Sequence, residues 1–440
     1  MKRTPVACLV PGRAAGAAET DPRRSAGDRI LLVGQDRLGE VAAPPAGLVL
    51  VDAVPFSHPV IRWLGRGTPV ALTDAAAAAQ WTAGEPVVLD AVGRELRAAG
   101  PDERPAPWTA PPPPEAGRPV RTGDGVAVHL CASIAGAADA ARARASGAAS
   151  IGLVRSEYLV PGDGGAPTEG FYRQAFGAML RLAAPLALTI RLLDLAGDKW
   201  PGWLPRRGAG EALDGLHGSQ LYAYEPVARV VDAQLAALKG VAETKPLRLI
   251  WPSGGRLEDF TARRDRLRAS LPPAVPVGAM VETPVELLAL REWLGEADFV
   301  AIGCNDLLSN LFGADRDNPR QGRLLDPYRP GLYRFLGEAC DRAGTGLERV
   351  QLCGLLPQVE GVLPVLIGLG LRRFSGEPAL IPLLARCVAA GTVRACEELA
   401  GAVCRAEDSD AVRQLVGAPT RGPWGLVNEG VPRTAARPRG

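Results

Sequence analysis

The feature that most constrains the fold is a series of eight short apolar runs, separated by longer helix-forming stretches, between residues 120 and 400. The runs are VAVHLCASI, SIGLVRSE, LTIRLLD, LRLIWPS, VGAMVETP, FVAIGCNDL, RVQLCG and RRFSGEP. The segments between them, such as PVELLALREWLGEA, are rich in the Ala, Leu, Arg and Glu of crossover helices. Eight strand–helix repeats over this length predict an α/β fold, a closed (β/α)8 TIM barrel.

The rest of the chain divides around this repeat. Residues 1–100 alternate short β-runs (RILLVG, GLVLVD, TPVALT, PVVLD) with small-residue stretches, which predicts a separate compact α/β unit. Residues 101–119 are Pro-rich and predict a stiff extended linker. The barrel is assigned to residues 120–408, and the Gly-, Pro- and Arg-rich residues 409–440 are predicted to be disordered.

Composition excludes several classes of function. A hydrophobic content of 47% and a net charge of +2 are typical of a globular protein and argue against a nucleic-acid partner. The eight cysteines form no CxxC pair, as expected for free thiols in a reducing compartment. The N-terminal run VACLV is too short for a signal-peptide core and no run reaches membrane-spanning length. We therefore expect a cytoplasmic protein with no membrane contact.

Acidic residues stand directly after two buried runs. Glu282 ends VETP and Asp306, beside Asn305, ends IGCNDL. In TIM barrels the carboxyl ends of the strands gather around one site, so both carboxylates are candidate ligands of a hard cation such as Mg²⁺. The alternative is that they are two solvated carboxylates in loops.

Other strand ends supply cations and a thiol. Arg155, Arg191 and Arg316 suit a clamp for phosphate and carboxylate groups, and Lys199 adds a weaker candidate. Taken singly, each arginine is better explained as a surface salt-bridge residue in so Arg-rich a chain. Cys353 ends a strand and is either a small buried hydrophobe or, at a catalytic rim, a group that donates or accepts a proton.

His58 is the most informative of the three histidines. It lies between Ser57 and Pro59 in FSHPVIRWLG, and this pattern predicts that the imidazole stands at the start of a helix. Alone, a surface histidine carries no functional meaning. Together with the strand-end residues it indicates phosphoryl transfer, because a neutral imidazole is a nucleophile near pH 7.

The ordered set of motifs resembles the phosphoenolpyruvate-utilising enzymes, most closely enzyme I of the bacterial sugar phosphotransferase system. The segments that carry the resemblance cover about residues 5–390 and run LVPGRAAG, FSH, IGLVRSEYL, TIRLLDLAGDK, VGAMVETP, AIGCNDL, ADRDN, LCG and LIGLGLRRFS. The resemblance implies a phosphohistidine swivel domain followed by a phosphoenolpyruvate-binding TIM barrel. It also implies a homodimer formed through the barrel.

The resemblance implies a role for each candidate residue. His58 would be the phosphohistidine and Cys353 would protonate the enolate carbon to release pyruvate. Glu282 and Asp306 would hold Mg²⁺. The residues that would bind phosphoenolpyruvate are Arg155, Arg191, Asn305 and Arg316.

The sequence also departs from the family pattern. A short polar loop, TDPRRSAGD, stands where enzyme I inserts the helical domain that docks its carrier protein. Ala53-Val54 replaces the Gly-Gly expected before the histidine. Gln220 replaces an expected arginine and Leu355 an expected glutamate.

Three functions remain open at this point. The first is phosphorylation of His58 by phosphoenolpyruvate, followed by transfer to an unidentified acceptor, either a protein or a small molecule. The second is a catalytically degenerate phosphoenolpyruvate-binding regulatory protein, which the departures favour. The third is a small-molecule enzyme of the same superfamily whose reaction bypasses His58.

Overall fold

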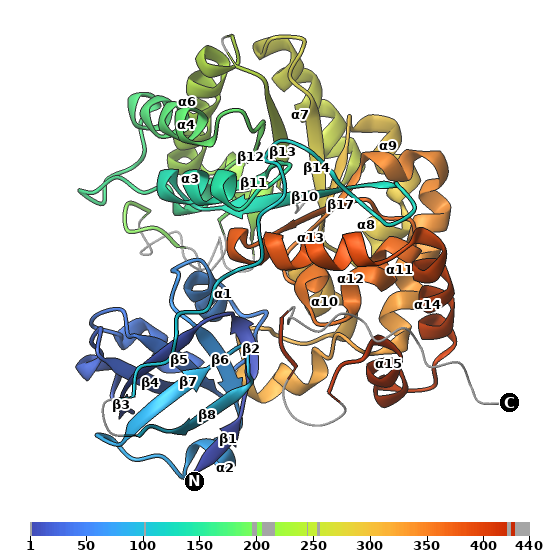
Figure 1. Cartoon of the computed structure of the whole chain (residues 1–440). Coiled ribbons are helices and arrows are strands. Elements are labelled where there is room, and N and C mark those ends of the chain that lie inside the picture. Colours follow the sequence, from blue (N-terminus) through green and yellow to red (C-terminus); the bar gives the residue numbers. More distant parts are fainter. Residues whose placement is uncertain are drawn as a thin grey trace, which may run out of the picture.

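The computed structural model contains two bodies, an N-terminal sheet unit and a larger barrel, joined by the linker (Figure 1). The structure describes residues 2–100, 103–195, 200–204, 216–243, 245–252, 256–419 and 424–426. Lys199 and residues 427–440 lie outside this part of the chain.

The N-terminal unit is one mixed eight-stranded sheet in the order β1-β8-β7-β3-β4-β5-β6-β2. Its strands are β1 (Arg3–Pro5), β2 (Ala7–Val10), β3 (Arg13–Glu19), β4 (Arg29–Gly34), β5 (Gly47–Val51), β6 (Val70–Thr73), β7 (Pro86–Asp90) and β8 (Glu95–Ala98). Strands β3 to β6 are parallel, and the other pairings are antiparallel. Helix α1 (His58–Leu64) connects β5 to β6, α2 (Ala75–Ala78) follows β6, and short 3-10 turns flank β4.

The second body confirms the predicted barrel. Its eight parallel strands are β10 (Ala127–Ile134), β11 (Ser150–Arg155), β12 (Leu188–Arg191), β13 (Leu247–Trp251), β14 (Val277–Val281), β15 (Val300–Gly303), β16 (Val350–Cys353) and β17 (Arg373–Gly376). Each strand falls within one of the eight predicted runs. The pairing of β17 with β10, and of β10 with β11, closes the barrel, while β9 (Val120–Arg121) adds an antiparallel edge to β10.

Helices surround the barrel (Figure 1). They are α3 (Ala137–Ala145), α4 (Glu169–Ala183), α6 (Glu225–Ala242), α7 (Leu257–Ser270), α8 (Pro284–Leu288), α9 (Leu290–Glu296), α10 (Cys304–Phe312), α11 (Pro330–Ala343), α12 (Val362–Gly368), α13 (Ile381–Ala390), α14 (Val393–Arg405) and α15 (Ser409–Val416). No single described helix has the length and hydropathy needed to cross a membrane. The bent pair Pro378–Ala390 and Val393–Arg405 meets that test only in combination.

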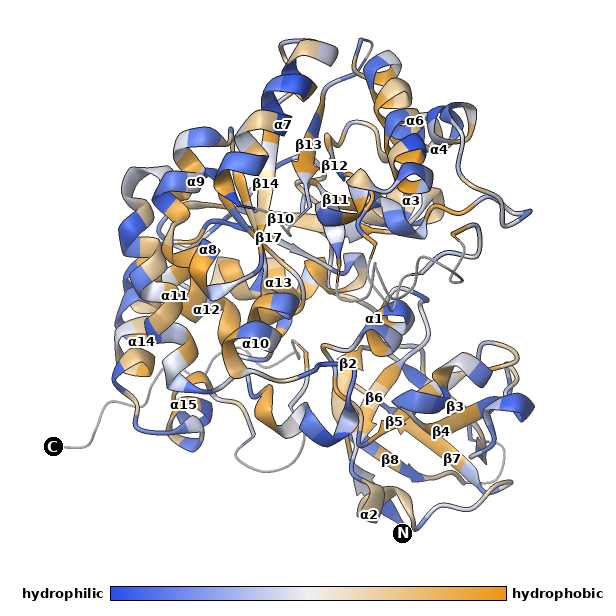
Figure 2. Ribbon diagram, turned by 180° about the vertical axis from the view of Figure 1, so that it is seen from behind, coloured by the Kyte–Doolittle hydropathy of each residue, from blue (hydrophilic) through white to orange (hydrophobic). Residues whose placement is uncertain are grey.

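The burial of the barrel strands explains why they could be predicted from runs of apolar residues. Every residue of β12, β14, β15 and β16 is buried, because the barrel fills its own interior while the helices cover its outside. Figure 2 shows largely hydrophobic strands and outer helices with hydrophilic faces. A layer of buried side chains from five strands, with Phe299 beside it, fills part of the barrel: Leu153, Ile250, Met280, Phe299, Ala301 and Cys353.

The tail prediction is wrong for residues 409–419 and 424–426. Helix α15 is capped by Asp408, whose carboxylate accepts a hydrogen bond from the N–H of Ala411. The N–H of Leu426 donates to the Cys8 carbonyl over 2.7 Å. The segment 424–426 therefore contacts the N-terminal unit through a backbone hydrogen bond, which its Gly/Pro composition does not predict.

The two bodies share further contacts. Arg94 forms an ion pair with Glu360, and the rings of Phe56 and Trp424 lie 4.8 Å apart between centroids. Residues 103–119 contain no helix or strand, and Trp108 packs against the core. The linker thus runs along the molecule rather than away from it.

Candidate active site

One cavity at the carboxyl ends of the barrel strands contains every site residue predicted from the sequence apart from Lys199, which lies outside the described residues. This rim cavity has a volume of about 80 Å³, and the predicted residues that line it are His58, Arg155, Arg191, Glu282, Asn305, Asp306, Arg316 and Cys353. His58 comes from the N-terminal unit and the others from the barrel. The two bodies therefore build the cavity together.

His58 is held at the first position of α1, as the sequence predicts. Its backbone N–H donates to Asp317 Oδ1 over 2.8 Å, and its ring Nδ1 lies 2.8 Å from Asp317 Oδ2. A carboxylate accepts, so Nδ1 carries the proton and the lone pair is on Nε2. Arg316 Nη2 lies 2.5 Å from Nε2, consistent with a donor facing that lone pair.

Asp317 is a positioning residue that the sequence reasoning missed. Burial alone would raise the pKa of its carboxyl, but the hydrogen bonds from His58 and the charge of Arg316 hold that pKa below its ordinary value. The sequence did offer a clue to this residue, because Asp317 directly follows the predicted Arg316 in ADRDN. Its partner is in another body, which sequence spacing does not reveal.

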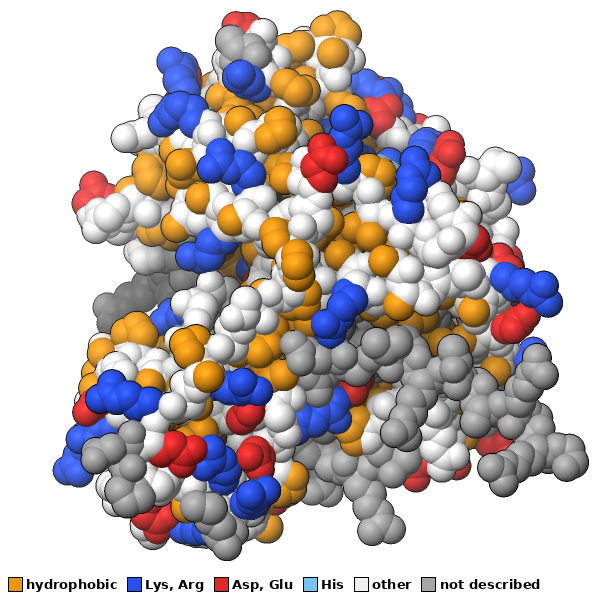
Figure 3. Space-filling model, in the orientation of Figure 1, with side chains coloured by type: hydrophobic (Ala, Val, Ile, Leu, Met, Phe, Trp, Pro, Cys, Tyr) orange, Lys and Arg blue, Asp and Glu red, His pale blue; other side chains and the backbone are white. Residues whose placement is uncertain are grey.

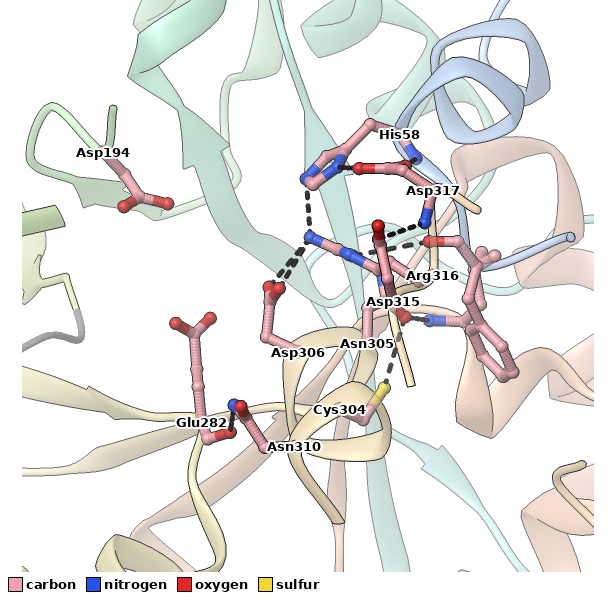
Figure 4. A network of polar contacts seen from close by, with 12 residues as sticks. His58, Asp194, Glu282, Cys304, Asn305, Asp306, Asn310, Asp315, Arg316 and Asp317 are labelled. Carbon is pink, nitrogen blue, oxygen red and sulfur yellow. Dashed lines mark hydrogen bonds and ion pairs between the residues drawn. The ribbon is translucent and has the colours of Figure 1, made fainter. Parts of the chain in front are cut away.

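Arg316 connects the histidine to the barrel rim. Its Nη2 lies 2.8 Å from Asp306 Oδ1, and its Nη1 donates to the Phe56 carbonyl over 3.4 Å (Figure 4). The guanidinium therefore bridges one carboxylate of the rim and the imidazole.

Arg191 lies deeper, among carboxylates. Its guanidinium pairs with Glu157 and, over 2.9 Å, with Asp194 Oδ2. Burial alone would lower the pKa of Arg191, but these acids raise it above its ordinary value. Glu157 and Asp194 were not among the predicted site residues, although both stand within three residues of a predicted arginine.

Arg155 faces a further acid that was not predicted, Glu377. Its Nη2 lies 3.8 Å from Glu377 Oε1, and its guanidinium lies 5.2 Å from the ring centroid of Tyr158. Burial raises the pKa of Glu377 to about 7, although Arg155 opposes the rise. Glu377 follows β17 directly, so its place after a predicted strand was a usable signal.

Glu282 and Asp306 follow neighbouring strands, β14 and β15, and both line the rim cavity. Gly303 leaves room for the Glu282 side chain, because a Cβ there would lie 2.2 Å from Glu282 Oε1. Figure 4 shows the carboxylates of Asp194, Glu282 and Asp306 around a common space. Within the described ranges, no cluster of three or more His, Cys, Asp or Glu side chains is arranged to hold a metal ion.

Cys353 ends β16 and is 3% exposed. Burial raises the pKa of its thiol to about 12, although the Gln351 amide, 3.3 Å from the sulfur, opposes the rise. The next residue, Gly354, has a φ of 106° and leaves room for Asn305, whose Oδ1 would lie 2.7 Å from a Cβ. The thiol is therefore a protonated acid at neutral pH.

Gln220 and Leu355, two of the departures from the family pattern, lie in different places. Gln220 is exposed, does not line the rim cavity, and accepts a hydrogen bond from the His217 N–H over 3.2 Å. Leu355 is buried, lines the cavity, and donates its N–H to Asn305 over 3.0 Å. Of these two replacements, only Leu355 in place of the expected glutamate removes a charge from the wall of the rim cavity.

The chain belongs to the phosphoenolpyruvate-utilising enzyme family, because residues 115–392 match the family model described as "PEP-utilising enzyme, PEP-binding domain". That match covers all eight barrel strands.

Relatives agree with this assignment. A phosphoenolpyruvate-protein phosphotransferase of Streptomyces coelicolor is 31% identical over 380 residues, or 83% of this chain and 67% of that protein. A protein of the same name from Bacillus sp. is 30% identical over 58% of this chain and 45% of that protein. A multiphosphoryl transfer protein of Xanthomonas campestris pv. campestris is 29% identical over 68% of this chain. The chain spans only 36% of the Xanthomonas protein.

Proposed function

We propose that the protein transfers the phosphoryl group of phosphoenolpyruvate to His58, releases pyruvate, and passes the phosphoryl group to an acceptor. The observation that carries this proposal is the 2.8 Å contact between His58 Nδ1 and Asp317 Oδ2, which leaves the Nε2 lone pair toward the rim cavity. A swivel role for the N-terminal unit is part of the proposal for a protein acceptor, because such an acceptor must reach that nitrogen from outside the rim cavity.

Unsatisfied polar atoms in the cavity support an anionic substrate. Arg155 Nε, Arg191 Nε and Ser375 Oγ are buried and have no hydrogen-bond partner among the described residues. All three side chains line the rim cavity. A phosphate and a carboxylate would supply the acceptors that these donors lack.

The proposed reaction balances with the residues present. His58 Nε2 attacks phosphorus, a P–N bond forms, and the bond from phosphorus to the enol oxygen breaks. The electron pair from that bond leaves as the enolate of pyruvate. Cys353 then gives its proton to the enolate carbon, and the thiolate regains a proton from water. Asp317 keeps the proton of Nδ1 in place throughout.

The carboxylates fit a magnesium ion that shares its sphere with substrate. Glu282 and Asp306 offer hard oxygen ligands from neighbouring strand ends, and Gly303 keeps space beside Glu282. Two carboxylates leave most positions to water and phosphate, as Mg²⁺ prefers. When bound, the ion would neutralise charge on the phosphoryl group.

The direct test is to incubate the protein with phosphoenolpyruvate and Mg²⁺ and to follow pyruvate. We expect one burst of pyruvate per chain, with a matching amount of acid-labile, base-stable phosphate on the protein. Chelation of Mg²⁺ should suppress both. Pyruvate without bound phosphate would contradict the phosphohistidine step.

Replacement of Asp317 with Asn is expected to slow the labelling of the protein. The amide no longer holds the Nδ1 proton as a carboxylate does, so the tautomer with its lone pair on Nε2 is no longer enforced. Carboxylates that orient a metal-bound histidine contribute about 10- to 100-fold, and we expect a loss of the same order here. Rapid-quench labelling measures the rate, with exposed Asp315→Asn as the nearby control. An unchanged rate would remove Asp317 from the account.

Replacement of Gly303 with Ala is expected to displace the Glu282 carboxylate, because the new Cβ would lie 2.2 Å from Oε1. The side chain is flexible, so the fold should survive and the metal requirement should change. We expect the Mg²⁺ concentration for half-maximal labelling to rise about tenfold. Gly295→Ala is the control, since a Cβ there meets nothing within 4 Å. Equal Mg²⁺ curves would argue against this metal site.

The second candidate is a regulatory protein that binds phosphoenolpyruvate without turnover. Two observations favour it: Leu355 stands at the cavity wall, and Arg316 contacts Nε2 directly. Its signature is thermal stabilisation by phosphoenolpyruvate with no pyruvate formed.

A cytoplasmic homodimer formed through the barrel also belongs to the proposal. Light scattering should give the mass of two chains at micromolar concentration. A monomer at every concentration would refute this part.

A further inference from the structure

A second, much larger cavity adjoins the rim cavity. This linker cavity has a volume of about 1150 Å³ and lies between α1, the linker and the barrel. The residues shared by the two cavities are Ile61, Ser133, Arg155, Tyr158 and Glu377. A molecule in the linker cavity is therefore separated from His58 by one layer of side chains.

The lining of the linker cavity suits a largely apolar molecule. Trp108 and Pro111–Pro113 of the linker form one wall, and Ile61 and Leu64 of α1 form another. In Figure 3, hydrophobic side chains gather where the two bodies meet. The few charged groups, among them Arg62 and Arg142, are what a ligand pocket uses to orient its occupant.

A protein acceptor has poor access to His58 in this arrangement. The His58 side chain is 12% exposed, and its Nε2 faces Arg316. Several contacts hold the N-terminal unit against the barrel, among them those of Gln35 with the Asp317 carbonyl, Arg94 with Glu360, Arg142 with the Gly65 carbonyl, and Leu426 with the Cys8 carbonyl. A small molecule in the linker cavity stands one layer of side chains from the same nitrogen, so its approach leaves these contacts intact.

We propose, on the basis of the proposed function, that the phosphoryl acceptor is a small hydroxyl compound with a largely apolar body, bound in the linker cavity, and that Glu377 is the base for its hydroxyl. Glu377 stands where the two cavities meet, directly after β17. Its carboxyl also lies next to α1, since a Cβ on Gly65 would lie 3.4 Å from Glu377 Oε2.

The transfer step balances. The acceptor oxygen attacks the phosphorus held on His58 Nε2, a P–O bond forms and the P–N bond breaks. The electron pair returns to Nε2, and the hydroxyl proton moves to the Glu377 carboxylate. The Glu377 pKa of about 7, set by burial against Arg155, with Asp139 and Arg142 also facing it, makes this carboxyl an effective base near neutral pH.

The test uses full-length protein loaded with radioactive phosphate from phosphoenolpyruvate. The loaded protein is mixed with the small-molecule ultrafiltrate of an extract from the source organism, or with the protein that the filter retains. The variant Ala135→Trp fills the linker cavity without touching the rim cavity. Ala138→Trp, on the exposed face of α3, is its matched control.

We expect the ultrafiltrate to remove the label from wild-type protein and from Ala138→Trp, and to yield a labelled phosphate ester. Ala135→Trp should load normally and transfer about 100-fold more slowly, because a misplaced acceptor loses the reactive geometry. Glu377→Gln should lower transfer from preloaded protein by about 100-fold and remove the rise in rate through about pH 7.

Three outcomes would overturn this inference: transfer only to retained protein, label that stays on His58 with both fractions, or equal transfer by both tryptophan variants. In each of these the loading step still occurs, so the proposed function survives. Failure to load at all would refute the proposed function and this inference together.

Discussion

Replacement of His58 with Gln is expected to abolish phosphate transfer from phosphoenolpyruvate to the protein. Glutamine keeps a polar side chain at the start of α1 but offers no nucleophilic nitrogen to the rim cavity. No other histidine lines that cavity, among the residues that the structure describes. The measurement is radioactive labelling followed by alkaline gel electrophoresis.

The control for this experiment is His129→Gln. His129 lies in β10, and its backbone N–H donates to the Arg372 carbonyl, a bond that the substitution preserves. It should label as wild type does. If His58→Gln were labelled equally, the phosphohistidine would have to be elsewhere. If it kept full pyruvate production without label, an enzyme that bypasses His58 would be the better account.

Replacement of Cys353 with Ala is expected to reduce pyruvate formation strongly. The thiol is the acid at the end of β16, and positioned acids contribute about 10²- to 10⁴-fold. Alanine leaves a small space in the barrel layer that includes Met280, a loss that the fold should tolerate. Coupled-enzyme assays of pyruvate measure the effect, and thermal melting shows whether the variant is folded.

The pH dependence of the same step follows from burial of the thiol. Burial raises the pKa of Cys353 to about 12, so the proton that it donates is present throughout the neutral range. The rate should show no loss of this acid between neutral and moderately alkaline pH. Cys340→Ala, in helix α11, is the control and should keep full activity. A Cys353→Ala enzyme with undiminished pyruvate formation would assign the proton to another group.

Much of the site was predictable because strand ends in a barrel converge. Glu282, Asp306 and Cys353 each follow an apolar run, and closure of the barrel brings those ends together whatever lies between them. The same argument placed Arg155 and Arg191. These positions could be predicted without knowledge of the strand register or of the loop conformations.

The partners of these residues were not predictable in the same way. Asp317 and His58 belong to different bodies and are 259 residues apart in sequence. No local sequence pattern predicts a contact between residues so far apart. Glu377 and Asp194 each lie beside an arginine at the site. Those contacts depend on how the chain packs, which the sequence pattern does not show. The prediction of a disordered tail was wrong for a similar reason. Helix α15 is stabilised by its N-cap and by packing, neither of which follows from amino-acid composition.

The most direct measurement is to locate the phosphate after incubation with phosphoenolpyruvate and Mg²⁺, by mass spectrometry of peptides kept at alkaline pH. A single phosphate on the imidazole of His58, absent when phosphoenolpyruvate is omitted, is the predicted result. An unmodified His58 peptide would contradict the account, whether or not pyruvate forms.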